Sequence, residues 1–144
     1  MRRMRALIAV ACLAAAIAAA PSFSAGDRVA VGYRLSIDVP AGWHISHRHF
    51  TPCCNPVERF SVINGDQILM LQERLDPVKQ ELSPRPRHFS VRGEPSPLEC
   101  CSIGGRPGWI LQFGAQRRAF YAYLYPGHHS ARRLLSILQT LRVR

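Results

Sequence analysis

Hydrophobic and polar residues alternate along the chain from residue 29 onward. Every second residue from Tyr33 to Val39 is hydrophobic, and this period of two predicts a half-buried strand over Val29–Val39. A turn at Pro40–Gly42 separates it from a second alternating segment, Trp43–Phe50. The sequence therefore predicts β-structure at the start of the domain.

A hairpin is predicted next. Glu58–Ile63 and Gln67–Leu75 flank Asn64–Gly65, and an Asn-Gly pair between two such runs is a strong signal for a tight turn. A helical turn over Asp76–Gln80 and a short strand over His88–Val91, within a proline-rich connection, complete this part of the chain.

The last third of the chain predicts a second hairpin followed by a helix. Trp109–Phe113 and Arg117–Tyr125 predict a second hairpin around residues 114–116. Ser130–Thr140 then predicts an amphipathic helix, because hydrophobic residues recur at helical spacing: Ala131, Leu134, Leu135, Leu138 and Leu141. The predicted fold class is α+β, an antiparallel sheet of about six to seven strands with one principal C-terminal helix packed on it.

The first residues have the layout of a secretory signal peptide. Met1–Arg5 is basic, Ala6–Ala20 is an apolar run, and small residues follow Pro21. We predict a signal peptide over residues 1–24, with cleavage after Ser24 or at Ala25, and one exported domain over 25–144. The alternative is an uncleaved anchor, but the 15-residue run is shorter than the roughly 20 apolar residues that span a bilayer. The domain would act in the periplasm, in the cell envelope or outside the cell.

The composition is that of a small folded domain with a basic net charge. Hydrophobic residues make up 47% and charged residues 19% of the chain, which excludes a disordered chain and a multi-span membrane protein. Removing the three leader arginines reduces the formal charge from +10 to +7. This surplus suggests an anionic envelope surface or a partner protein, whereas nucleic acid is an improbable partner for an exported chain. The candidate residues are Arg85, Arg87, Arg117, Arg118, Arg132 and Arg133.

Four cysteines stand in two adjacent pairs, Cys53–Cys54 and Cys100–Cys101. Exported proteins keep disulfides, so we predict that one pair bridges the other, with the connectivity left open. The closed loop of about 47 residues would contribute roughly 4 kcal/mol by the chain-entropy model. A vicinal disulfide, a metal site and a thiol function are the alternatives.

Histidines and carboxylates give weaker signals for chemistry. His44, His47 and His49 are candidate ligands for zinc or copper, because His47 and His49 share a strand face. Apart from that alternative, no cofactor is expected.

Among the carboxylates, Glu58 and Glu73 are each followed by an arginine, and Asp76 is nearby. Alternating charges on a solvated strand face are the favoured interpretation of these residues. No nucleophile elbow, phosphate loop or zinc-protease motif occurs, so no catalytic residue is predicted.

Several segments resemble a family of small uncharacterised exported bacterial proteins: Tyr33–Trp43, Pro56–Val62, Leu71–Arg74, Pro84–Phe89 and Leu135–Val143. The resemblance covers nearly all of the chain after the leader. It implies one domain and supplies no catalytic residue. The strand-Pro-x-Gly-Trp opening and the helix-plus-strand ending also resemble the PsbP-like fold, whose members are mostly non-catalytic assembly and binding proteins and are typically longer.

These observations favour an exported, non-enzymatic binding or assembly domain stabilised by disulfides at the cell envelope. The alternative is a metal- or thiol-dependent protein that uses the vicinal cysteines with His44, His47 and His49.

Overall fold

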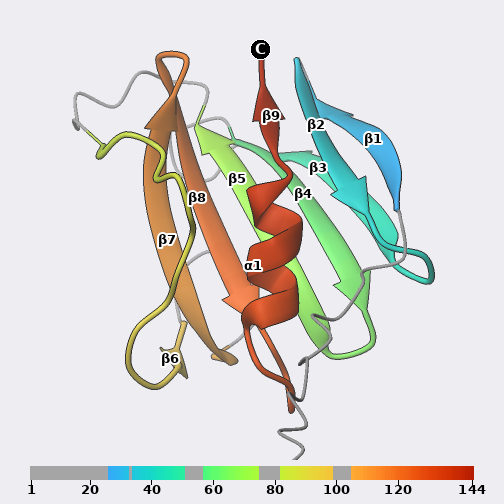
Figure 1. Cartoon of the computed structure of the whole chain (residues 1–144), viewed down its shortest axis with the longest axis vertical. Coiled ribbons are helices and arrows are strands. Elements are labelled where there is room, and N and C mark those ends of the chain that lie inside the picture. Colours follow the sequence, from blue (N-terminus) through green and yellow to red (C-terminus); the bar gives the residue numbers. More distant parts are fainter. Residues whose placement is uncertain (1–25, 33, 51–56, 75–81, 99–104) are drawn as a thin grey trace, which may run out of the picture.

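The computed structural model describes residues 26–32, 34–50, 57–74, 82–98 and 105–144. These residues form nine strands and one helix (Figure 1). The elements are β1 Asp27–Gly32, β2 Leu35–Val39, β3 His44–Phe50, β4 Val57–Asn64, β5 Gln67–Arg74, β6 Ser96–Pro97, β7 Pro107–Ala115, β8 Arg118–Tyr125, α1 Arg132–Gln139 and β9 Arg142–Val143. The predicted signal peptide lies outside the described residues.

The strands form two antiparallel sheets. The main sheet has six strands in the order β3-β4-β5-β8-β7-β6, and the smaller one has three in the order β1-β2-β9. The prediction of antiparallel strands with one C-terminal helix is confirmed. The prediction of a single sheet of six to seven strands is wrong, because β1 and β2 leave the main sheet and pair with the chain end instead.

The predicted strand Val29–Val39 is also wrong in part. It is a hairpin, in which β1 pairs with β2 and Gly32 lies opposite Leu35. The chain reverses at Arg34, whose φ of 53° is uncommon for a residue with a side chain. The alternation predicted for the second half is confirmed, since Leu35, Ile37 and Val39 are buried.

The two later hairpins differ in how well the turns were predicted. Asn64 pairs with Gln67, and Gly65 takes a φ of 59°, as the Asn-Gly signal predicts. The second turn lies at Gln116 and Arg117, with φ values of 52° and 61°, and not at residues 114–116. Sequence reasoning chose the glycine for the turn, whereas Gly114 continues β7 and pairs with Ala119.

The proline-rich connection follows the edge of the fold. Residues 88–91 form no strand, contrary to the prediction, and the short strand β6 occurs instead at Ser96–Pro97. Gln139 of α1 holds the connection: its amide accepts a hydrogen bond from the Phe89 N–H at 3.0 Å and donates one to the Arg87 carbonyl at 2.7 Å. The predicted helical turn Asp76–Gln80 lies outside the described residues.

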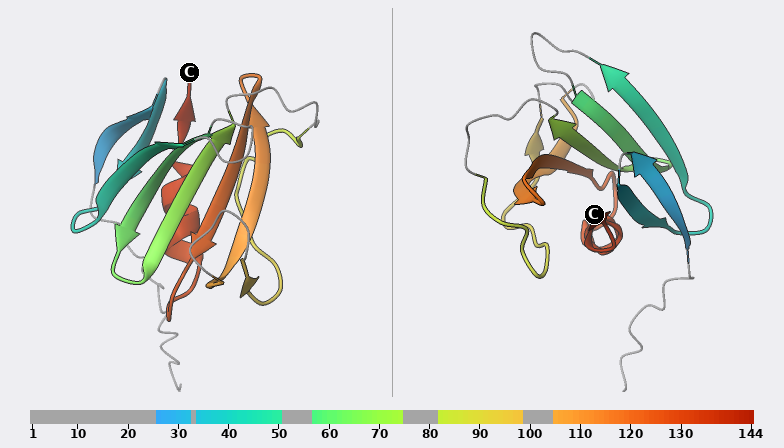
Figure 2. Two further views of the ribbon diagram at one scale, coloured as in Figure 1. Left: turned by 180° about the vertical axis from the view of Figure 1, so that it is seen from behind. Right: turned by 90° about the horizontal axis from the view of Figure 1, so that it is seen from above.

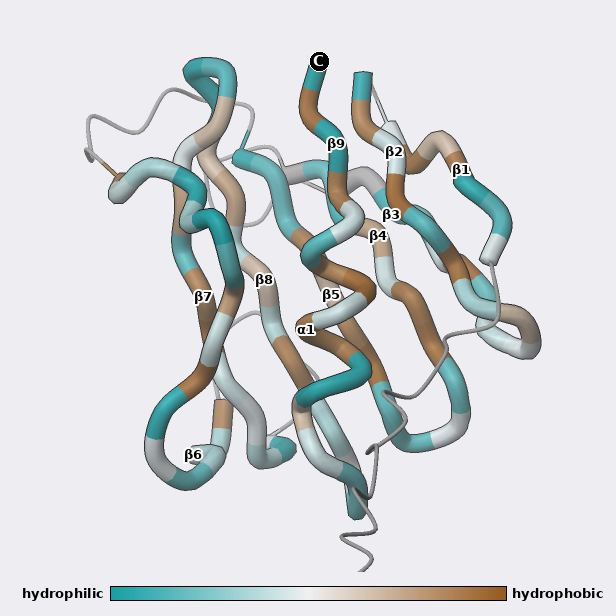
Figure 3. Tube along the Cα trace, viewed as in Figure 1, coloured by the Kyte–Doolittle hydropathy of each residue, from teal (hydrophilic) through white to brown (hydrophobic). Residues whose placement is uncertain are grey.

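The helix α1 covers the inner face of the main sheet. Seen from above, it lies inside the curve of that sheet, with β1 and β2 beside it (Figure 2). Hydrophobic positions concentrate where α1 meets the sheets (Figure 3), and Leu134, Ile137 and Leu138 are buried there. Each large side chain so buried contributes about 1.5–3 kcal/mol. Within the described ranges, no helix is long and apolar enough to cross a membrane.

Strand parity gives the main sheet two buried faces. The face toward α1 carries a cluster that includes Phe60, Leu71, Phe113 and Phe120. The opposite face carries a smaller cluster of Ile68, Met70, Leu98, Tyr121, Tyr123 and Tyr125. The inner face therefore holds most of the core, and any polar side chain on it must find partners.

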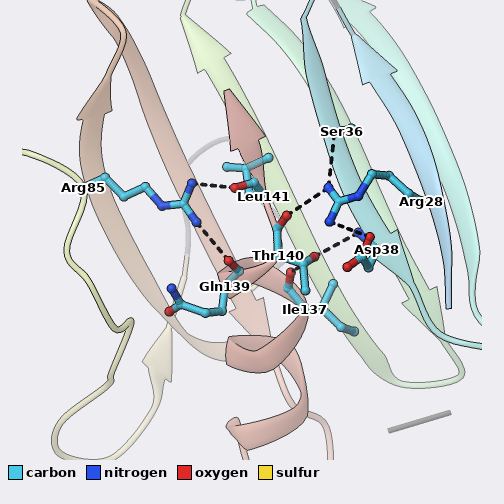
Figure 4. Close-up of polar contacts among 8 residues, drawn as sticks. All are labelled: Arg28, Ser36, Asp38, Arg85, Ile137, Gln139, Thr140 and Leu141. Carbon is cyan, nitrogen blue, oxygen red and sulfur yellow. Dashed lines mark hydrogen bonds and ion pairs between the residues drawn. The ribbon is translucent and has the colours of Figure 1, made fainter. Parts of the chain in front are cut away.

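Polar contacts fix the C-terminal end of α1 from both sides (Figure 4). The Arg85 guanidinium donates to the Leu141 carbonyl at 2.5 Å and to the Gln139 carbonyl at 3.0 Å. Partial burial lowers the pKa of Arg85, which still leaves it charged at neutral pH. A cation at a helix C-terminus also interacts favourably with the helix dipole.

The smaller sheet fixes the other side of the same helix end. Thr140 accepts a hydrogen bond from the Asp38 N–H at 2.9 Å and donates its hydroxyl proton to the Ile137 carbonyl at 2.7 Å. Arg28 forms an ion pair with Asp38 at 2.8 Å. Because α1, β2 and β9 are joined in this way, the hairpin of β1 and β2 is fixed over one end of the inner face.

Candidate functional site

Four ionisable side chains lie in a row across the inner face of the main sheet. His47 is on β3, Glu58 on β4, Glu73 on β5 and Arg118 on β8, and these four strands are neighbours in this order. Glu58 and Glu73 are directly opposed in the pairing of β4 with β5. The row therefore carries a basic group at each end and two carboxylates in the middle.

Strand pairing explains why all four share the core face. Glu73 is opposite Phe120, and Arg118 precedes Phe120 by two residues, so all three point to one side. His47 is opposite Phe60, which follows Glu58 by two residues. The polar row thus continues the face that carries Phe60 and Phe120 in the core.

The strongest interaction in the row joins Glu73 to Arg118. The guanidinium donates from Nε to Oε1 at 2.5 Å and from Nη2 to Oε2 at 2.6 Å, which is a bidentate arrangement. The two side chains are only 10% and 16% exposed. The same guanidinium lies over the Phe120 ring, 5.5 Å from its centroid. The pair is therefore fixed in place and poorly hydrated.

The second pair in the row is more open to solvent. His47 Nε2 lies 3.0 Å from Glu58 Oε2, with side-chain exposures of 48% and 31%. Opposed carboxylates on neighbouring strands repel each other, so the Arg118 guanidinium paired with Glu73 reduces that cost. A change at His47 or Arg118 would disturb the whole row.

A cavity of about 270 Å³, here called the end pocket, lies at this row. The tip of the hairpin of β1 and β2 forms its other wall. Its lining residues are Val31, Gly32, Leu35, His47, Glu58, Phe60, Glu73 and Arg118. Arg118 Nη1 is buried and has no hydrogen-bond partner among the described residues. A buried donor without an acceptor is costly, so the Glu73–Arg118 pair leaves one hydrogen bond unmet beside the cavity.

This arrangement corrects the favoured interpretation of the carboxylates. Glu73 is 8% exposed and pairs with Arg118 across β5 and β8, so it does not lie on a solvated face. Its neighbour in sequence, Arg74, points to the other side by strand parity. The signal was present, because Glu73 shares parity with Leu69 and Leu71. Asp76 lies outside the described residues.

The candidate histidines do not all lie on one face. His44 is exposed and lies on the opposite face of β3 from His47, while the His49 side chain is outside what the structure describes. No group of three metal-ligating side chains occurs among the described residues. The zinc or copper site therefore stays a prediction, as do the disulfides, because both cysteine pairs lie outside the described ranges.

The candidate arginines have different surroundings. Arg85 is engaged at the end of α1, and Arg118 is engaged by Glu73. Arg87, Arg117 and Arg132 are exposed. Arg133 is also exposed, and its guanidinium lies 5.4 Å from the Trp43 ring centroid. The anionic-surface hypothesis consequently rests on the last four residues.

Comparison with known proteins gives no relative. No family model matches the chain, and neither the curated proteins nor the solved structures contain a significant match. The resemblances described from the sequence therefore stay predictions, and function has to be argued from the end pocket.

Proposed function

We propose that this chain is an exported, disulfide-stabilised binding domain of the cell envelope, and that the end pocket is its binding site. Export and disulfides rest on the leader and on the cysteine pairs. The position of the site rests on the geometry of the polar row. The coarse fold supports the proposal, because a cavity lies at one end of the inner face of the sheet.

The observation that carries the proposal is the burial and the hydrogen bonding of Arg118. This side chain is largely buried, it is held rigidly by Glu73, and it keeps one buried nitrogen without a hydrogen-bond acceptor. Arg118 lines the cavity and is held rigidly, so little conformational entropy would be lost when a molecule contacts this side chain. Neither the cavity along α1 nor the cavity beside Trp43 is lined by such a bidentate pair.

At Glu73, binding explains the geometry better than proton transfer does. Both oxygens of Glu73 already accept N–H groups from one guanidinium, so a proton transfer at Glu73 would have to break that pair. The row is thus suited to present fixed donors and acceptors to a molecule in the pocket.

Ligand titration followed by amide NMR tests this function. The purified protein would be titrated with small polar compounds of four kinds: sugars, amino acids, polyamines and dicarboxylates. We expect one kind to shift the amides around the end pocket. We also expect His47→Ala and Glu58→Gln to weaken that binding by about tenfold, as expected for a lost hydrogen bond to a charged group.

His44→Ala is the matched control, because it removes an exposed histidine from the opposite face of the same strand. It should leave the affinity unchanged. The proposal is overturned if no compound binds at the end pocket, or if His44→Ala and His47→Ala weaken binding equally.

A further inference from the structure

We infer that the ligand of the end pocket is a neutral polyhydroxylated molecule the size of one sugar ring. This inference rests on the proposed function, since it names the chemistry of a molecule bound at that same site. Three properties of the pocket support it: its charge balance, its unused hydrogen-bonding capacity and its size.

Each carboxylate of the row already has a basic partner within the protein. Glu73 and Arg118 form a bidentate pair, and Glu58 lies against His47. An ammonium ligand would approach Glu73 only in competition with the Arg118 guanidinium, and an anion would meet two carboxylates. Either would also lose its own hydration in a site that is partly closed. A ligand without net charge avoids both costs.

The pairs leave hydrogen-bonding capacity of both kinds. Arg118 donates to Glu73 through Nε and Nη2, whereas Nη1 is buried beside the pocket and has no acceptor among the described residues. Each carboxylate oxygen of Glu73 has a second lone pair that can accept from a donor. A hydroxyl group both donates and accepts, so neighbouring hydroxyls can satisfy Arg118 and Glu73 together without breaking their pair.

The remaining walls fit the apolar side of a sugar. Phe60, Val31 and Leu35 line the pocket beside the polar row. A pyranose ring combines C–H surface with a rim of hydroxyls, and it would place the former on these side chains. The volume of about 270 Å³ lies just below the range of about 300–1,000 Å³ that holds drug-sized ligands. One ring, free or at the end of a glycan, is the matching size.

The test uses small polar probes that differ in charge. D-Glucose, D-galactose and N-acetyl-D-glucosamine would be titrated into the wild-type protein, alongside ethylammonium, acetate and glycine. We expect at least one sugar to shift the amides of the pocket residues. Its Kd should change less than about twofold between 50 and 500 mM salt, because screening acts on charged ligands and not on neutral ones.

A pair of neighbouring variants supplies the control. Arg118→Lys removes Nη1 and should weaken sugar binding by about tenfold or more, whereas Arg117→Lys, at an exposed turn position, should not. If Arg118→Lys does not fold, the wild-type salt dependence and the probe comparison still decide. Binding of ethylammonium, acetate or glycine at the pocket, with no sugar bound, overturns this inference and leaves the proposed function standing. If no compound of any kind binds there, both fail.

Discussion

The buried pair of Glu73 and Arg118 allows a quantitative test of how the inner face is built. In Glu73→Ala, the guanidinium of Arg118 loses two charge-assisted hydrogen bonds and stays in a position that is 16% exposed in the native protein. Replacing both residues by leucine instead removes the charge and continues the apolar face that carries Phe60 and Phe120.

The expected magnitudes differ sharply between the two variants. Breaking one partner of a buried pair costs about 3–5 kcal/mol, because an uncompensated charge remains in poorly hydrated surroundings. We expect the lower half of this range for Glu73→Ala, since Arg118 can turn toward the end pocket and regain some water. The double variant should lie within about 1 kcal/mol of the wild type, or be more stable, because well-packed hydrophobic residues often replace a buried ion pair without loss.

Urea unfolding followed by circular dichroism measures both values, with Glu94→Ala as a control at an exposed acidic position. The coupling energy follows from adding Arg118→Leu and Glu73→Leu as single variants. If Glu73→Ala costs less than about 1 kcal/mol, the pair behaves as a surface salt bridge, and the description of a rigid, poorly hydrated site is refuted.

Four further predictions concern other parts of the chain. Arg85→Ala should destabilise the protein by about 2–3 kcal/mol, because two charged hydrogen bonds at the end of α1 are lost. Arg87→Ala, at an exposed position, should destabilise it by less than about 0.5 kcal/mol. Urea unfolding measures both values, and equal effects would reject the role of Arg85. The His128 N–H holds the pKa of Asp66 below its ordinary value of 3.8, so the wild type should be more stable than Asp66→Asn above that pH. This advantage should be lost as the pH falls further, through the lowered pKa, and a pH-independent difference would contradict the argument. Mass spectrometry of the non-reduced, exported protein should show four hydrogens lost and peptides linked between the two cysteine pairs, whereas free thiols with stoichiometric zinc or copper would favour the metal- or thiol-dependent alternative. Retention on an anionic matrix should fall with salt and fall again in Arg117→Ala, and salt-insensitive retention would reject the anionic-surface hypothesis.

The elements that the sequence predicted well are those fixed by local signals. The hairpin at Asn64 and Gly65 and the final helix depend on turn chemistry and on helical spacing, and both are confirmed within about two residues. The reversal at Arg34 was missed because neither an arginine nor the alternation on both sides of it indicates a turn. The assignment of β1 and β2 to a separate sheet depends on pairing with β9, about a hundred residues later, and no local pattern contains that contact.

Part of the lining of the end pocket could be predicted from the sequence. Parity along the predicted strands already placed Glu58 with Phe60, and Glu73 with Leu71, on the core-facing side. That signal was overridden because each acid is followed by an arginine, which suggested alternating charges in solvent. The sequence could not show that β5 pairs with β8, and this pairing is what brings Arg118 to Glu73.

Burying the charges of Glu73 and Arg118 costs free energy, and this cost bears on what the pair does in the protein. Apolar residues at Glu73 and Arg118 would extend the core of the inner face and avoid desolvation of two charges, so stability alone does not require this pair. The helix end is already fixed by Arg85 and Thr140, and the nearby hairpin is joined to it through β9. If the double leucine variant folds with unchanged stability and no longer binds the sugar probes, the pair is retained for recognition. If it folds and still binds them, Arg118 does not carry the binding and the proposed role of the pair is refuted.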